Sequence, residues 1–530
     1  MNQAFKNFKL IFLQILTFLA FQVNAQEIRK YTPPVFGTDW SKPSEYPDRI
    51  VINFGQDPSN QVNVTWRTNS DIKIAYAEIA IASAAPRFWR TAKTIKAKTE
   101  LLDASELQGA NVLANYHAIE FKDLEPGTKY GYRVGDGERW SEWFQFETAS
   151  ANKNEKFSFL YVGDAQNYIL ELWSRLIREG FKTAPNAKFI IHAGDLINNA
   201  HNEQEWHEWF TAGGFIHSMI PSVTTPGNHE YRALNEEESK LGKRSLSVQW
   251  RPQFTLPENG PDGLEETVYF MDYQDVRLIT LNSNVELERQ AIWLEEVLKN
   301  TKQKWKIVTY HHPLFSASNG RDNSKLRELW KPIFDAYNVD LALQGHDHAY
   351  ARGRVSPGEN LMDGVNMRDQ TGTVYVVSVS GGKMYKIGDD WTANGAQRDR
   401  VGENTQLFQV ISVDGDQLLF ESYTAIGELY DSFQFTKNGD NPNIFLELRA
   451  NAVPEKYHSN TTYYGDILPK ELEEKLMKEY LDYAISRVSS YKIDEQLIFK
   501  VRLENGETVV NLTLRTRSPI DSSAACGPFT

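Results

Sequence analysis

The sequence contains a single cysteine, Cys526, among 530 residues. An intrachain disulfide is therefore excluded, unlike in small secreted scaffolds, which several disulfides usually hold together. Beyond the first 25 residues the chain also lacks an apolar run of about 20 residues, which a membrane-spanning helix needs. Basic residues are fewer than acidic ones: the chain has 57 Lys and Arg and 70 Asp and Glu, which gives a net charge of −13. A nucleic-acid-binding surface needs a basic face, so that class of protein is disfavoured.

The rest of the composition is that of a globular protein. Hydrophobic residues make up 41% of the chain and charged residues 24%, which are ordinary values for a folded protein. The length allows roughly three or four domains of about 150 residues. The chain can therefore build large hydrophobic cores and rely on them for stability.

The N-terminus has the pattern of an export signal. Lys6 and Lys9 precede an apolar stretch from Leu10 to about Val23, and small residues follow up to Ala25. A membrane anchor is the alternative, but the stretch is short for a span, and the small residues favour cleavage. We therefore predict a signal peptide at residues 1–25 and a periplasmic or secreted mature protein without a transmembrane anchor.

Two segments of different character follow the predicted signal peptide. Residues 26–45 are rich in Pro, Thr and Ser and are predicted to be a linker. Residues 46–149 contain short alternating apolar runs, such as "QVNVTWRT" and "YHAIEFKDL", with turn residues between them. Five to seven such strands in about 100 residues predict an all-β, immunoglobulin-like sandwich. No catalytic motif is visible in it.

Residues 155–436 are predicted to form an α/β core. Apolar strands alternate with segments of helical spacing, such as "YILELWSRLIREG" and "QAIWLEEVLKN". Residues 437–530 then form a small α+β extension of unknown role. It combines an amphipathic helix, with Leu472, Leu476 and Tyr480 on one stripe, and a hairpin around Asn505 and Gly506. Packing against the core or a partner is the default interpretation of that extension.

Polar residues follow five predicted strands of the core. Ligand sites of α/β sheets lie beyond the carboxyl ends of the strands. Any one of these fragments could be a simple turn with a solvent-facing side chain, but five at strand ends are hard to ascribe to coincidence. The fragments are "VGDAQ" with Asp164, "HAGDLIN" with Asp195, "TPGNHEY" with Asn228 and His229, "YHHPLF" with His311 and His312, and "GHDH" with His346 and His348.

These residue types suit a pair of metal ions. His346 and His348 are two residues apart, so in an extended segment their imidazoles point to the same side. Histidine is the commonest metal ligand, and two adjacent ions need a bridging carboxylate with mixed oxygen and nitrogen donors. A two-metal site stabilises the attacking and leaving oxygens of an in-line displacement, such as phosphate-ester hydrolysis.

The ordered series GD, GD, GNHE, HHP and GHDH resembles the calcineurin-like metallophosphoesterases. Within them the chain is most similar to the purple acid phosphatase branch, since "VYFMDYQDVRLITLNS", "GHDHAYAR" and the preceding β-sandwich also fit that branch. The resemblance covers about residues 45–436. It implies a fibronectin-III-like N-terminal domain and a four-layer core of two mixed sheets flanked by helices.

The resemblance also implies roles for individual residues. Asp195 would bridge two metal ions, and His229 would contact the phosphate and assist the leaving group. Asp164 and His348 would complete the ligands of the first ion. Asn228, His311 and His346 would complete those of the second. The implied reaction is in-line attack of a metal-bound hydroxide on phosphorus, and the implied cofactors are two divalent or mixed-valence ions of Mn, Zn or Fe.

One position departs from the branch. Purple enzymes carry a metal-binding tyrosine three residues after the second Asp, where this chain has Asn198, and other branches place a histidine where it has Gln166. Gln166 or Asn198 could supply an amide oxygen, and the loss of the tyrosinate favours Mn²⁺, Zn²⁺ or Fe²⁺ over ferric iron. His312 could line the pocket, and His201 could reach its rim.

The sequence thus predicts an exported dinuclear phosphohydrolase that acts on small phosphomonoesters. A phosphodiesterase or nucleotidase with the same site is the alternative within enzymes. A non-catalytic binding or adhesion protein is the alternative of another class, and the intact ligand series argues against it. The natural substrate, the metals and the oligomeric state are left open.

Overall fold

The computed structural model describes residues 41–355, 369–439, 441–448 and 451–457, together with the backbone of two short strands near the C-terminus. The compact unit of Gly37–Tyr457 contains all of these residues except the two C-terminal strands. No helix in these described ranges is long and apolar enough to cross a membrane. The predicted signal peptide, most of the predicted linker and the predicted helix with Leu472, Leu476 and Tyr480 lie outside the described residues.

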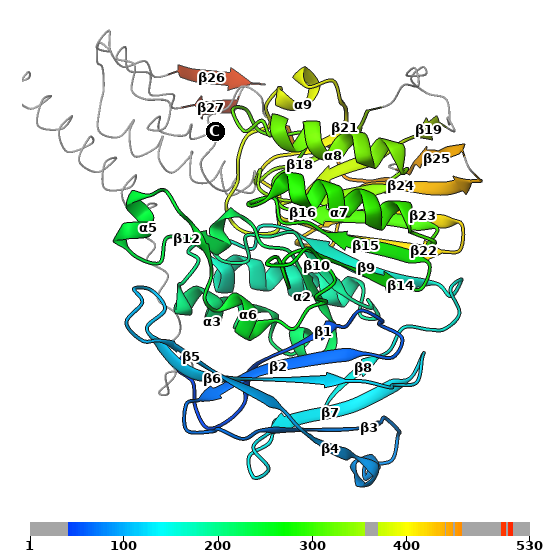
Figure 1. The fold of residues 1–530 in the computed structure, drawn as a ribbon. Helices are drawn as coiled ribbons and strands as arrows, with labels where there is room; N and C mark the ends of the chain where they lie inside the picture. The colour runs from blue at the N-terminus through cyan, green and yellow to red at the C-terminus, as the bar shows by residue number, and fades with distance from the viewer. Residues whose placement is uncertain are drawn as a thin grey trace, which may run out of the picture. The chain divides into compact units, whose positions relative to one another are not determined.

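The N-terminal part is a sandwich of two antiparallel four-stranded sheets, as predicted (Figure 1). Its strands alternate inward apolar and outward polar residues, and Trp66, Phe121 and Phe146 lie in its core. One sheet has the order β1-β2-β6-β5 and the other β4-β3-β7-β8. The strands are β1 (Asp48–Phe54), β2 (Val62–Asn69), β3 (Tyr76–Ile81), β4 (Lys93–Lys96), β5 (Lys98–Ala104), β6 (Val112–Phe121), β7 (Lys129–Gly135) and β8 (Phe144–Glu147).

The first sheet of the core has eight strands in the order β11-β10-β9-β22-β23-β24-β25-β19. Three of them, β9, β10 and β11, run parallel, and the others are antiparallel, so the sheet is mixed. The strands are β9 (Phe157–Val162), β10 (Ile190–His192), β11 (Ser222–Thr224), β19 (Asp369–Thr371), β22 (Leu407–Asp414), β23 (Gln417–Thr424), β24 (Leu429–Asn438) and β25 (Asn441–Glu447).

The second sheet has seven strands in the order β14-β15-β16-β17-β20-β18-β21 and is also mixed. β15, β16 and β17 are buried along almost their whole length, as expected of parallel strands covered on both faces. The strands are β14 (Tyr269–Tyr273), β15 (Val276–Thr280), β16 (Trp305–Tyr310), β17 (Leu341–Gln344), β18 (Tyr350–Arg354), β20 (Val374–Val377) and β21 (Gln397–Gly402).

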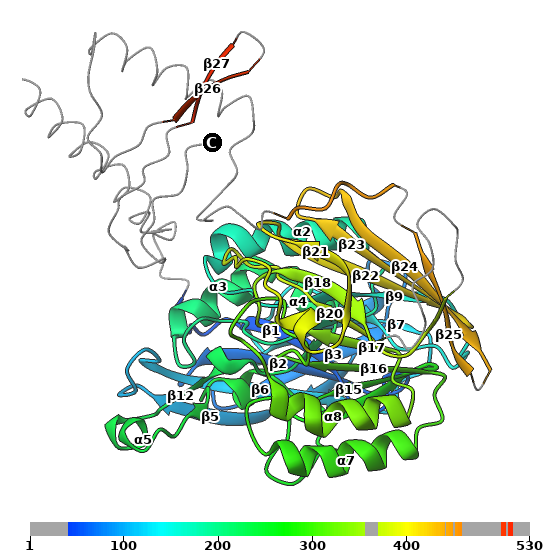
Figure 2. The same ribbon diagram turned by 90° about the horizontal axis from the view of Figure 1, so that it is seen from above.

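The two sheets face each other, and helices cover their outer faces (Figures 1 and 2). α7 (Leu287–Lys299) and α8 (Ser324–Ala336) lie on the seven-stranded sheet, and α2 (Ser174–Thr183) and α3 (Glu203–Gly213) lie on the other side of the core. The Tyr161 hydroxyl on β9 donates to the carbonyl of Gln344 on β17, which ties the two sheets together. The predicted four-layer α/β core is therefore present.

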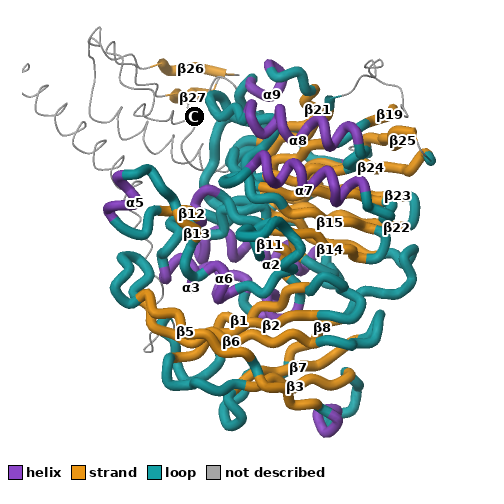
Figure 3. The backbone as a smooth tube through the Cα atoms, viewed as in Figure 1, coloured by secondary structure: helices purple, strands orange, loops and turns teal. Residues whose placement is uncertain are grey.

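Loops and short elements gather at one end of the sheets (Figure 3). They lie at the carboxyl ends of the parallel strands, where the sequence predicts the site. The short elements there are η3 (Asn228–Glu230), β12 (Tyr231–Arg232), α5 (Glu236–Lys240), β13 (Ser245–Leu246) and α9 (Asp390–Ala393). Two others contact the sandwich: α4 (Phe215–Met219), which precedes β11, and α6 (Trp250–Gln253).

The core continues past the expected boundary at residue 436. That boundary falls inside β24, and β25 pairs with β24 in the same sheet. The turn residues Asn438 and Gly439, which the sequence analysis placed at the start of an extension, instead lie at the turn of a hairpin. Further on, β26 (Lys500–Glu504) and β27 (Glu507–Asn511) are antiparallel, which agrees with the predicted hairpin, although its turn lies outside the described residues.

Candidate metal centre

Five strands deliver the predicted site residues to one place. β9 and β10 lead to Asp164 and Asp195, and β11 leads to Asn228 and His229, all in the eight-stranded sheet. In the other sheet β16 leads to His311, and β17 leads to His346 and His348. The structure brings all of these side chains except His229 into one buried or nearly buried cluster between the ends of the two sheets.

The carboxylates and imidazoles of the cluster form two groups, in each of which the donor atoms lie within 4.8 Å of one another. The first group is Asp195 with His311 and His346, and the second is Asp164 with Asp195 and His348. Asp195 belongs to both groups, so its carboxylate stands where a bridging ligand would stand. The side-chain oxygen of Asn228 joins the first group, 3.1 Å from His311 Nε2 and 2.9 Å from His346 Nδ1.

The orientation of the imidazoles fits metal binding. His311 Nδ1 lies 2.8 Å from the carbonyl of Ala193, and His348 Nδ1 lies 3.1 Å from the carbonyl of Lys383. A carbonyl accepts, so each Nδ1 carries a proton and each Nε2 faces inward, where it can bind a metal once it is unprotonated. This arrangement, in which the outer nitrogen bonds a carbonyl, is usual for metal-ligating histidines.

Inside the cluster, the inward-facing atoms of these side chains lie close together. His311 Nε2 lies 3.1 Å from the Asp195 carboxylate and 3.2 Å from His346 Nδ1. Burial lowers the pKa of His311, but Asp195 and Asp164 outweigh burial and raise this pKa to about 9. Burial raises the pKa of Asp164 well above its usual range, with His311 opposing. Cations would take the place of the His311 proton and stabilise the buried carboxylate of Asp164, so the donors present fit two metal ions.

Gln166 also belongs to the cluster. Its Nε2 donates to Asp195 Oδ2 at 2.6 Å and lies 3.3 Å from His348 Nε2. Its Oε1 is buried and has no hydrogen-bond partner among the described residues. An uncompensated buried amide oxygen costs free energy, and exchanging the two ends of the amide would place this oxygen beside Asp195 and His348, where it could serve as a donor to a cation.

Asn198 contributes through its backbone. Its carbonyl accepts a hydrogen bond from His229 Nδ1 at 2.6 Å, which leaves His229 Nε2 free to face the site. The main-chain N–H of His229 donates to Asp195 Oδ1 at 2.8 Å, and Nε2 lies 4.0 Å from Asp195 Oδ2. The His229 side chain is 27% exposed, so it can reach a ligand that enters from solvent.

His312 and His201 lie in different surroundings. His312 Nδ1 is 2.8 Å from the Ser283 hydroxyl, and its ring centroid lies 4.3 Å from that of His346. Burial lowers the pKa of His312 to about 3, so it packs beside the cluster as a neutral ring. His201 is buried, accepts the Val248 N–H through Nδ1, and belongs to neither group of metal-type donors.

Glu230 was missed by the sequence analysis, although it is the last letter of the GNHE motif. Its buried carboxylate accepts main-chain hydrogen bonds from Asp195, Leu196 and Ile197 at 2.8–3.3 Å and from Gly227 at 2.6 Å. Burial and Asp195 raise the pKa of Glu230 to about 8. It ties the loop of Asp195 to the loop of Asn228 and His229. Only the tertiary fold reveals that role.

The backbone at the cluster adopts unusual conformations. Asp164, Asp195, His346 and His348 have φ values of 52°, 53°, 78° and 46°, a left-handed region that side chains with a Cβ rarely adopt. Such strain is common at functional sites. Close approach also explains a glycine: a Cβ at Gly227 would lie 2.2 Å from Asp195 Oδ1.

Two parts of the chain match known protein families. Residues 47–148 match the N-terminal domain of purple acid phosphatases, and residues 157–350 match the calcineurin-like phosphoesterases. Purple acid phosphatase 5 of Arabidopsis thaliana is 25% identical over 291 residues, which cover 52% of this chain and 65% of that protein. Human acid phosphatase type 7 is 23% identical over 374 residues, which cover 64% and 79%.

Solved structures share the fold. The purple acid phosphatase PPD1 from yellow lupin seeds aligns with a TM-score of 0.60 at 20% identity, over 74% of this chain and 75% of that one. A structure of PhoD aligns with a TM-score of 0.53 at 14% identity, over 86% and 100%. Both support the architecture described above.

Proposed function

We propose that this chain, which belongs to the purple acid phosphatase-like branch of the calcineurin-like metallophosphoesterases, hydrolyses phosphate monoesters at a dinuclear metal centre. The observation that carries the proposal is the shared position of Asp195 in two adjoining groups of donors whose lone pairs converge. Two bound ions would supply Lewis-acid charge and an activated water to the reaction.

The chain's own residues hold and complete the centre. Asp195 would bridge, Asp164 and His348 would hold one ion with Gln166 as an added donor, and the amide of Asn228 would hold the other ion. His311 and His346 would join Asn228. With no tyrosinate at position 198, divalent Mn, Zn or Fe suits this donor set better than ferric iron.

His229 would act on the substrate. Its Nδ1 proton is engaged by the Asn198 carbonyl, so a second proton on Nε2 is the one it can give to the leaving oxygen. The partly exposed ring stands beside the bridging carboxylate, on the path of a phosphate that enters from solvent. General acid catalysis of this kind contributes about 10²–10⁴-fold.

The test combines metal analysis with hydrolysis of p-nitrophenyl phosphate and bis-p-nitrophenyl phosphate. We expect two ions per chain and faster hydrolysis of the monoester. Asp195→Asn should lose most bound metal and all measurable activity, whereas Asp71→Asn, on an exposed turn of the sandwich, should keep both. One ion or none in the reconstituted wild type would refute the proposal, and a strong preference for the diester would favour a phosphodiesterase.

The proposal includes export of the protein. The motivation is the charged, apolar and small-residue pattern of residues 1–25. We expect the mature chain to begin at or near Gln26 and to occur outside the cytoplasm. N-terminal sequencing of protein from fractionated cells tests this, and an intact Met1 in the cytoplasmic fraction contradicts it.

A further inference from the structure

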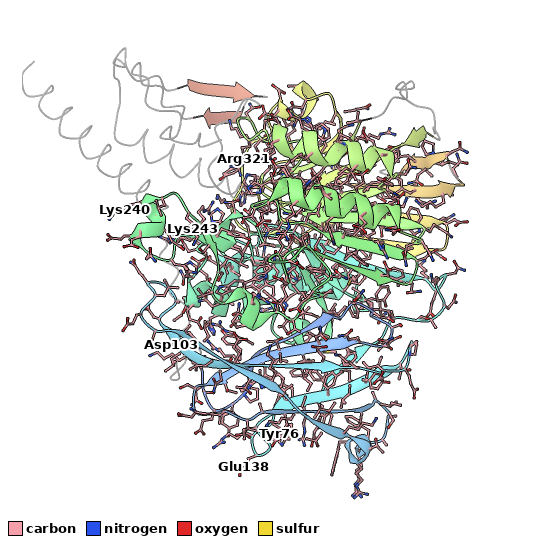
Figure 4. All side chains as sticks on the ribbon, in the orientation of Figure 1. Tyr76, Asp103, Glu138, Lys240, Lys243 and Arg321 are labelled. Carbon is pink, nitrogen blue, oxygen red and sulfur yellow. The ribbon has the colours of Figure 1, made fainter. Side chains whose placement is uncertain are left out.

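Arg321, Lys383 and Tyr385 form a half-buried cluster beside the candidate metal centre. The ring centroid of Tyr385 lies 4.8 Å from that of His348. The Arg321 guanidinium lies 5.1 Å from the centroid of the same tyrosine ring, and the Lys383 ammonium lies 5.4 Å from it. Two cations therefore share one aromatic ring that contacts a metal-ligand histidine. Figure 4 shows Arg321 on the side of the core that also carries Lys243.

Backbone contacts hold this cluster at a fixed distance from the centre. The Lys383 carbonyl accepts from His348 Nδ1, and the Tyr385 N–H donates to the His348 carbonyl at 2.9 Å. Arg321 donates to the His346 carbonyl and to Asp347, each at 3.0 Å. The cations are thus attached to the same turn that presents the two histidines.

One of the two charges of this cluster is not balanced by the residues that the structure describes. Asp347 offsets Arg321, but Lys383 has no carboxylate partner among the residues that the structure describes. Arg244, which donates to the carbonyls of Asn228 and Tyr231, also has no carboxylate partner among the described residues. Such cations stand out in a chain of net charge −13.

The site therefore carries more positive charge than one phosphate requires. Two divalent ions with the carboxylates of Asp164 and Asp195 already balance a phosphate dianion. Both cations lie against the Tyr385 ring, whose centroid is 4.8 Å from that of His348, so geometry alone places them close to the centre. A cation such as Lys383, which lacks a carboxylate partner among the described residues, would repel two bound metal ions unless an anion lay between.

We propose that Lys383 and Arg321 form a subsite for a second anionic group on the leaving portion of the substrate. This inference rests on the proposed monoesterase function and narrows its substrate class to small phosphate monoesters that carry another phosphate or a carboxylate. The Tyr385 ring forms the wall between this subsite and His348. The subsite lies on the His348 side of the centre, so the second anion is bound while the ester phosphate occupies the metals.

Three substrates with the same chain and the same primary alcohol test the subsite. They are propyl phosphate, 3-phosphooxypropanoate and propane-1,3-diol bisphosphate, and kcat/KM is measured for each with the metal-loaded enzyme. We expect at least one of the two doubly anionic esters to exceed propyl phosphate by about tenfold, which corresponds to about 1.4 kcal/mol. Which of the two is preferred identifies phosphate or carboxylate as the second group.

Variants assign the preference to the lysine. Lys383→Gln should abolish most of the preference, Lys383→Arg should retain it, and Lys98→Gln, the same charge change on an exposed sandwich strand, should leave it intact. Equal kcat/KM for all three esters in the wild type, or a preference that survives Lys383→Gln, overturns the subsite and leaves the proposed function standing. Failure to hydrolyse any of the three overturns the proposed function, and the subsite with it.

Discussion

His229 is held by its backbone and by one ring nitrogen, while its other nitrogen remains available. His229→Gln should therefore lower kcat by about 10²–10⁴-fold on an alkyl phosphate, because the leaving alkoxide loses its proton donor. The loss should be smaller for p-nitrophenyl phosphate, whose leaving group needs no proton. Metal content, measured on the same preparation, should match the wild type. An unchanged kcat on the alkyl ester contradicts the role.

The presence of Asn198 in place of a tyrosine leads to a second prediction, which concerns the visible absorption of the iron-loaded protein. The purple of iron enzymes in this branch comes from charge transfer between tyrosinate and ferric iron, and an amide cannot donate charge in that way. The iron-loaded protein should therefore show no intense visible band. Tyr168, a nearby tyrosine, is 51% exposed and so is a poor candidate for a substitute ligand.

Asn198→Tyr is the complementary variant. The substitution keeps the backbone carbonyl that anchors His229, so the site should stay assembled. If position 198 faces the metals, an absorption band should appear when ferric iron is bound. A visible band in the wild type would contradict the prediction, as would a colourless iron-loaded variant.

Among single residues, the sequence predicted best those whose side chains are typical metal ligands and which follow a strand. Asp164, Asp195 and the histidines follow apolar strands directly, so the strand-end rule placed them. Glu230 and Lys383 could not be placed in that way. The role of Glu230 depends on contact between two loops that are far apart in the sequence. The role of Lys383 depends on the hydrogen bond between its own carbonyl and His348, and on the lack of a carboxylate partner for its ammonium among the described residues.

Helix α3 connects the β-sandwich to the catalytic loop. Its first residue, Glu203, pairs with Arg49 and Arg67 of the sandwich, and the Glu203 N–H donates to the Gly109 carbonyl at 2.9 Å. Two residues further along the helix, the Glu205 carboxylate accepts the main-chain N–H groups of Asn198 and Asn199, each at 2.7 Å. The loop that anchors His229 is thereby held from both domains.

Glu205→Gln tests this connection. An amide accepts hydrogen bonds through one oxygen only, so the glutamine side chain should hold the loop of Asn198 and Asn199 less firmly than the carboxylate does. The His229 ring, which bonds the Asn198 carbonyl, should then be less well positioned. We expect kcat to fall by about tenfold, about 1.4 kcal/mol, with metal content and folding unchanged. The pH profile of kcat should shift as well, because the Asn198 carbonyl no longer fixes the His229 tautomer.

The matched control is Glu120→Gln, which removes the same charge from an exposed position of the sandwich. It should leave both kcat and the pH profile as in the wild type. A Glu205→Gln enzyme with normal kcat and a normal profile would show that the loop does not need this carboxylate.

Elements were predicted well where the pattern was local. The strand and helix alternation identified β16, α8 and β17, because their apolar period changes from buried runs to helical spacing. The end of the core was not predicted. β24 and β25 form a hairpin, and the residues of its turn are equally typical of a boundary between domains. Only the pairing of the two strands shows that they form a hairpin turn.

On the scale of the whole compact unit, acid stability depends on histidines that fold without a proton. His117 lies fully buried in the sandwich, where its two ring nitrogens lie 2.8 Å and 2.9 Å from the hydroxyls of Thr68 and Thr99. Burial lowers the pKa of His117 from 6.5 to about 4. His192 and His217, buried in the core, shift in the same direction.

The sign of the effect follows from proton uptake. Between pH 6.5 and about 4 the unfolded chain binds a proton at position 117 that the folded chain does not bind, so stability falls as the pH falls through this range. The loss from His117 between pH 7 and pH 4.5 should be roughly 2–3 kcal/mol. His117→Gln keeps a side chain that can bond the two threonines but cannot titrate. Its free energy of unfolding, measured by chemical denaturation, should therefore decline less steeply than that of the wild type across this range, whatever its value at pH 7. Identical slopes for the two proteins would mean that His117 does not set the acid sensitivity, and would direct attention to His192 and His217 in the core.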